Sequence, residues 1–153
     1  MNGAIAMKAL FIFVLHLLST LAVFAQNGPT PAFRAGAAKV DVTPSESELP
    51  KSYEGILDHI YSRAIVIDNG ATKAALLTLD AGAMPEQLWQ DVTKRAEIEL
   101  GIPVKHILMT ATHSHSVPRG AGSGLEQKVF QSLKLANEKL QPARIGYAPA
   151  SRI

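Results

Sequence analysis

The sequence predicts an α/β fold in which helices pack on a mixed sheet that contains a hairpin and a βαβ unit. Two strand-like runs, 62–68 and 73–80, flank Asn69-Gly70, a dipeptide typical of tight hairpin turns. Residues 85–100 have the apolar spacing of a helix, and 105–112 is again strand-like. Strand, helix and strand in this order predict a crossover between two parallel strands.

The N-terminus has the features of a secretory signal peptide. Lys8 precedes an apolar run without charges, which ends in Val23-Phe24-Ala25. We therefore expect residues 1–25 to be a signal peptide cleaved before Gln26, with 26–32 as a flexible leader and a secreted or periplasmic destination. The alternative is a retained membrane anchor, but the run is short for a bilayer span of about 20 residues.

The composition limits the classes of function. A chain of 153 residues has room for one domain, and a net charge of +2 without a basic patch gives no indication of nucleic-acid binding. The chain has no cysteine, so it has no disulfide partner, and a metal site must use nitrogen and oxygen ligands. No stretch indicates an oligomeric state.

The first elements follow from proline placement and hydropathy. Residues 33–44 resemble a strand that Pro44 ends, because proline cannot donate to a sheet. Residues 45–54 are polar and predict a surface loop. The nearly continuous apolar run at 73–80 predicts a strand buried on both faces.

Two helices and a last strand are expected after the hairpin. Pro85 suits the first turn of a helix, and Gly101 suits its end. A second amphipathic helix is expected at 125–140, and a strand at 143–148. A strand so near the end of the chain predicts an incomplete domain; the alternative is a short domain with a C-terminal edge strand.

The strand-like run at 107–112 leads into His113 and His115. In extended backbone, residues two apart project from the same face, so both imidazoles should point one way. Such a pair can hold zinc, or act as one ligand and one proton carrier. The alternative is two loop histidines without a metal, because two ligands do not complete a four-coordinate site.

Asp80 follows the strand at 73–80 and should lie near these histidines. Ligands of open α/β sheets gather beyond the carboxyl ends of parallel strands, which places Asp80, His113 and His115 around one crevice. Arg119 and the glycine-rich stretch 120–124 are its expected rim. Asp80 is a metal ligand itself, a group that supports the metal ligands, or a cap for the turn into the helix. No nucleophile elbow, phosphate loop or dinucleotide fingerprint is present.

Four blocks of the sequence resemble the neutral/alkaline, non-lysosomal ceramidases. The blocks are 35–44, 58–68, 75–80 and 112–118, and the resemblance extends from about Phe33 to Tyr147. It implies a zinc-dependent amidase that cleaves the N-acyl bond of a ceramide-like lipid substrate. It also implies that His113 binds the zinc ion and that His115 is a catalytic residue of the same site.

The chain departs from the family pattern at two points. Val117 stands where the family usually has glycine, and valine would resist a positive φ. The family's remaining ligands (a histidine, a glutamate and a tyrosine) and its active-site serine fall beyond the equivalent of Ile153. Residues 33–153 are therefore expected to be the truncated N-terminal portion of a ceramidase-like domain, inactive alone. The alternative is a small secreted α/β binding module whose histidines are structural or bind metal weakly.

Overall fold

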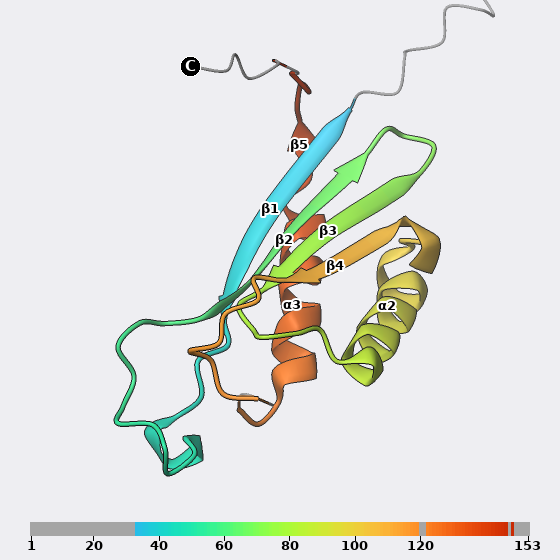
Figure 1. Cartoon of the computed structure of the whole chain (residues 1–153). Coiled ribbons are helices and arrows are strands. Elements are labelled where there is room, and N and C mark those ends of the chain that lie inside the picture. The colour runs from blue at the N-terminus through green and yellow to red at the C-terminus, as the bar shows by residue number, and fades with distance from the viewer. Residues whose placement is uncertain (1–32, 120–121, 147, 149–153) are drawn as a thin grey trace, which may run out of the picture. The chain divides into compact units, whose positions relative to one another are not determined.

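A five-stranded mixed sheet, in the order β4-β3-β2-β1-β5, carries the helices α2 and α3 on one face (Figure 1). The computed structural model describes residues 33–119, 122–146 and 148. The expected signal peptide and leader lie outside these residues. Within the described part, no helix has the length and hydropathy needed to cross a membrane.

The central strands follow the chain in order. β2 (Tyr61–Asp68) pairs antiparallel with β1 (Arg34–Asp41) on one side and with β3 (Lys73–Leu79) on the other. α2 (Glu86–Leu100) then crosses to β4 (Ile107–Ala111), which pairs with β3 in parallel. The predicted α/β class, with a mixed sheet, a hairpin and a βαβ unit, is confirmed.

The C-terminal part differs from the prediction in its last strand. α3 (Leu125–Glu138) is followed at once by the short strand β5 (Gln141–Pro142), which pairs with the beginning of β1. The expected strand at 143–148 is wrong, since 143–146 form no strand. Two 3-10 turns, η1 (Glu46–Glu48) and η2 (Val104–His106), lie in the connections.

The hairpin between β2 and β3 is confirmed, but its turn is not the two-residue type expected. That type needs positive φ at both central residues, whereas only Gly70 has it, at 84°. The side chain of Asn69 instead accepts hydrogen bonds from the backbone N–H groups of Ala71 and Thr72, at 3.0 and 2.8 Å. These bonds stabilise a wider connection, 69–72.

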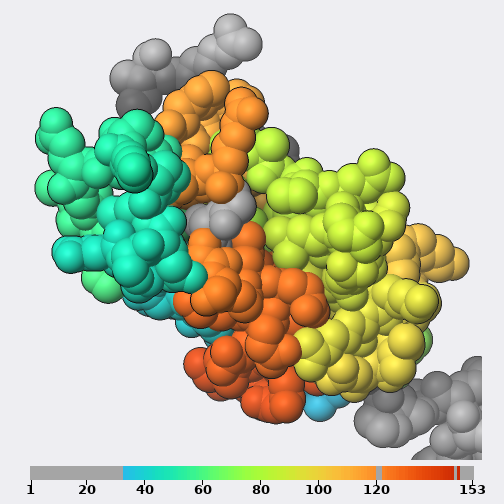
Figure 2. All heavy atoms as spheres, turned by 90° about the horizontal axis from the view of Figure 1, so that it is seen from below, coloured from blue at the N-terminus to red at the C-terminus, as the bar shows by residue number. Residues whose placement is uncertain are grey.

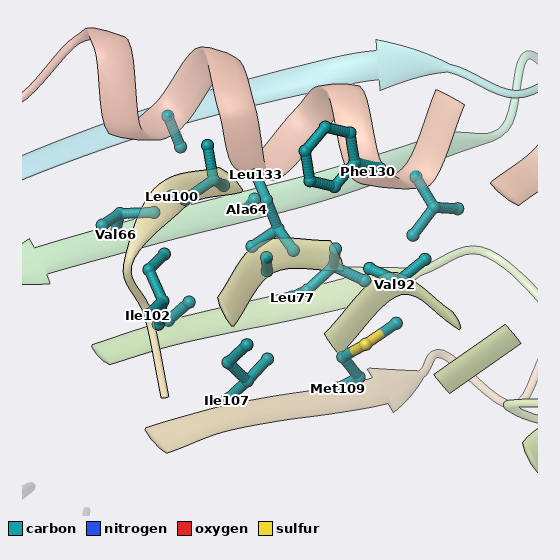
Figure 3. Packing of buried hydrophobic residues seen from close by; sticks show 14 of the residues in the cluster. Ala64, Val66, Leu77, Val92, Leu100, Ile102, Ile107, Met109, Phe130 and Leu133 are labelled. Carbon is teal, nitrogen blue, oxygen red and sulfur yellow. The ribbon is translucent and has the colours of Figure 1, made fainter. Parts of the chain in front are cut away.

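The core lies between the sheet and the two helices (Figure 3). Val66 and Leu77 point from the sheet toward Val92 of α2 and Leu133 of α3, and all four are almost completely buried. At Gly36 the sheet and α3 approach so closely that a Cβ would lie 2.1 Å from the backbone oxygen of Ala136. The burial of apolar side chains on this face holds the strands in place, and the candidate site lies at the ends of two of these strands.

The opposite face of the sheet is open among the described residues. Ile65, Leu76 and Leu108 oppose one another in register across three strands and remain 47, 47 and 58% exposed. The expectation that β3 is buried on both faces is therefore wrong. Both helices pack on the other face of the sheet, so no helix of the described part covers the face that carries Ile65, Leu76 and Leu108.

Candidate functional site

The candidate site lies where β3 and β4 end. Because these strands are parallel, the segments that follow them leave the sheet side by side. Two hydrogen bonds continue the pairing: Thr112 N–H donates to Leu79 O at 3.0 Å, and Ser114 N–H donates to Ala81 O at 3.2 Å. The β1–β2 loop, residues 42–60, forms a further wall and lies beside the orange segments in Figure 2.

These segments enclose a cleft of about 690 Å³. Asp80, His113, His115 and Arg119 all line it. The structure thus brings together the side chains that the sequence placed around one crevice. Of the predicted rim at 120–124, residues 120 and 121 lie outside the described part of the chain.

The two imidazoles meet at their outer nitrogen atoms. Nε2 of His113 lies 3.3 Å from Nε2 of His115, and the ring centroids are 5.0 Å apart with the rings inclined at 74°. Both side chains are exposed to the cleft and to solvent. Two nitrogens bound to one tetrahedral zinc at about 2.0–2.1 Å would lie about 3.3–3.4 Å apart. The observed separation therefore suits a shared cation.

The backbone reaches this arrangement in a way the sequence did not predict. β4 ends at Ala111, and His113 has a φ of 58°, in the left-handed region. The expected extended spacing is therefore wrong, although the two rings do converge. A non-glycine residue in this conformation costs about 1–3 kcal/mol and typically occurs where function requires it.

Asp80 lies in the cleft wall, but its carboxylate is engaged elsewhere. Oδ2 accepts a hydrogen bond from the backbone N–H of Tyr61 at 2.9 Å and pairs with Nη1 of Arg63 at 2.7 Å. Among residues 33–119, 122–146 and 148, no group of three or more histidine, aspartate or glutamate side chains could hold a metal ion. Asp80 therefore ties the end of β3 to the beginning of β2, a role that none of the alternatives anticipated.

A second histidine contact, missed at the sequence level, lies at the same end of the sheet. Nδ1 of His59 lies 2.5 Å from Oδ2 of Asp41. Hydrogen bonds from Thr43, together with His59, lower the pKa of Asp41 from 3.8 to about 2. The antiparallel pairing that sets Asp41 opposite Tyr61 could have revealed this contact, because it brings the residue before β2 beside the end of β1.

An apolar groove of about 340 Å³ adjoins the histidine cleft. The two hollows share five lining residues: Tyr53, Ile60, Ser114, Val117 and Pro118. Val117 does not have positive φ, so its β-branched side chain is accommodated without backbone strain. The arrangement offers a polar centre with two imidazoles next to an apolar compartment.

The fold is similar to that of solved ceramidase structures. One is described as neutral ceramidase from Pseudomonas aeruginosa, with 22% identity and a TM-score of 0.61 over 72% of this chain. Another, described as ceramidase complexed with C2, has the same identity and TM-score over 73% of this chain. The match spans 22% of each of those chains. No protein-family model and no curated protein sequence matches. The likeness shows that this chain shares the fold of part of a ceramidase.

Proposed function

We propose that this chain forms part of a zinc-dependent, ceramidase-like amide hydrolase, the part that carries His113 and His115. The observation that carries the proposal is their Nε2–Nε2 separation of 3.3 Å, in a cleft beyond two parallel strands. The fold shared with ceramidase structures supports the same class of reaction.

The two imidazoles fit two positions of a zinc site, and the remaining donors would come from outside the described residues. His113 would hold the ion, which when bound polarises an amide carbonyl and acidifies a water molecule. Nε2 of His115 faces the same point. It would accept and return a proton when His113 alone holds the ion, and it would not do so as a second ligand, because metal binding occupies its lone pair.

The adjoining apolar groove supports a substrate with an aliphatic portion, such as a ceramide-like N-acyl lipid. Val117 and Pro118 line both this groove and the cleft that contains the imidazoles. A lipid tail in the groove would leave its amide group in the cleft, where the histidines lie. Because the donor set is partial, we expect this chain alone to have no amidase activity.

Export also belongs to the proposal, on the strength of the signal-peptide pattern at 1–25. N-terminal sequencing of the protein secreted from cells tests it. The expected mature N-terminus is Gln26. Full-length protein retained in the cell fraction would contradict export.

A zinc titration by calorimetry tests the metal site. We expect a dissociation constant weaker than about 1 µM, because only two ligands are present. His113→Ala should abolish this binding and His115→Ala should weaken it, whereas the matched control His59→Gln should leave it unchanged. Equal binding by all variants would instead favour a binding module with structural histidines.

A further inference from the structure

The two ends of the β1–β2 loop are hydrogen-bonded to each other. At its base, Val42 N–H donates to Ile60 O at 2.9 Å, and Thr43 Oγ1 accepts from Ile60 N–H at 2.9 Å. Its outer part contains η1, whose last residue is Glu48. Oε2 of Glu48 accepts hydrogen bonds from the backbone N–H and the hydroxyl of Ser45, at 2.9 and 2.8 Å. These local bonds hold the η1 turn.

The other carboxylate oxygen of Glu48 makes a long-range contact. Oε1 accepts the backbone N–H of Ser123 at 2.7 Å, across 75 positions of sequence. Among the described residues, this is the one hydrogen bond between the β1–β2 loop and the segment 112–124. Beside it, Gly122 packs on Pro44, since a Cβ at Gly122 would lie 3.5 Å from the Pro44 Cα.

The position of Ser123 makes this contact relevant to the histidines. Ser123 lies just before α3 and marks the end of the segment that begins with His113 and His115. The upstream end of that segment is fixed to the chain just after β3, because Ser114 N–H donates to Ala81 O. The Glu48 carboxylate therefore holds its downstream end against the loop that forms the other wall of the apolar groove.

We infer that Glu48 is a positioning residue, a latch that fixes the β1–β2 loop to the Ser123 turn and so sets the width of the apolar groove beside the histidines. The hydrogen bond from the Ser123 backbone is the largest cause that lowers the pKa of Glu48 from 4.5 to about 2. The carboxylate is thus charged, and accepts a charge-assisted bond, at every pH at which the protein would work. The effect on metal binding rests on the proposed function; the latch itself does not.

Amide hydrogen exchange followed by NMR tests the latch with Glu48→Ala, Glu48→Gln and the matched control Glu46→Gln. Glu46 belongs to the same turn and is exposed. We expect Glu48→Ala to speed exchange at Ser123 about tenfold, because a hydrogen bond to a charged group is lost. Glu48→Gln keeps an acceptor oxygen and should be intermediate, and Glu46→Gln should match the wild type. β2 and β3 amides should be unchanged in every variant.

Unchanged exchange at Ser123 in Glu48→Ala would overturn the latch. Equal acceleration throughout the sheet would also overturn it, because Glu48 would then support only global stability. The affinity for Co²⁺, used as a spectroscopic substitute for zinc at the two histidines, gives a second readout. We expect Glu48→Ala to weaken this affinity about three- to tenfold. If the wild type binds no cobalt, the proposed metal site fails, while the exchange at Ser123 still decides the latch.

Discussion

Nε2 of His113 lies 3.3 Å from Nε2 of His115, and the chain reaches this contact by placing His113 in the left-handed region with a φ of 58°. In a regular strand the two residues would share a face but stand about 6.6 Å apart along the chain. The turn at His113 brings both nitrogens to one point in the cleft instead. The left-handed conformation of His113 therefore creates the pair of nitrogens that could bind a metal ion.

His113→Gly should be more stable than His113→Ala. Glycine adopts positive φ without a steric cost, whereas alanine retains it, so we expect a difference of about 1 kcal/mol in the free energy of unfolding. Urea denaturation of the two variants measures this difference. An alanine variant as stable as the glycine variant would show that the left-handed conformation is not maintained in solution.

Gly36→Ala should destabilise the fold. The new Cβ would lie 2.1 Å from the Ala136 backbone oxygen, so β1 and α3 must separate, at a cost of about 1–3 kcal/mol. Gly146→Ala is the matched control, because nothing lies within 4 Å of a Cβ there. Thermal unfolding should show a lower midpoint for the first variant alone; equal midpoints would contradict the close packing of β1 on α3.

Asp80→Ala should impair stability more than metal binding. The change leaves the Tyr61 N–H and Arg63 without their shared acceptor, which costs about 1–3 kcal/mol for a partly buried donor. Asp80→Asn keeps an acceptor for the Tyr61 N–H and should be milder. Urea denaturation and zinc titration of both variants distinguish the roles: a loss of zinc affinity as large as that of His113→Ala would restore Asp80 as a support of the metal ligands.

Stability should fall in acid partly through Asp41. Its pKa is lowered from 3.8 to about 2 in the folded protein, so the native state favours the ionised carboxylate. This contribution is fully present above the unfolded-state pKa and is lost as the pH falls through about 2. Asp41→Asn should therefore make the urea midpoint less dependent on pH between 4 and 2, whereas Glu54→Gln, an exposed change in the β1–β2 loop, should not. Identical slopes for Asp41→Asn and the wild type would contradict this assignment.

Local patterns predicted much of the fold. Asn69-Gly70 located the hairpin, and Pro85 and Gly101 located the limits of α2, where Gly101 has the left-handed conformation expected at a helix end. The strand–helix–strand order predicted the parallel pairing of β3 and β4, and with it the common cleft of Asp80 and the two histidines.

Features that depend on distant partners were not predictable in this way. Leu76 is part of an apolar run, but its exposure depends on which face the helices cover. The Asn69-Gly70 dipeptide favours a two-residue turn, but hydrogen bonds to the Asn69 side chain stabilise a wider connection. The Glu48–Ser123 contact joins residues 75 positions apart, and no periodicity or motif encodes such a contact.

The central claim is that the two imidazoles face a single cation, and nitrogen-15 NMR of the histidine side chains during a zinc titration tests it most directly. The account predicts that Nε2 of His113 takes the shift of a metal-bound nitrogen, and that His115 responds with the same midpoint while His59 and His106 do not change. An unchanged His113, or equal responses from all four histidines, would contradict it.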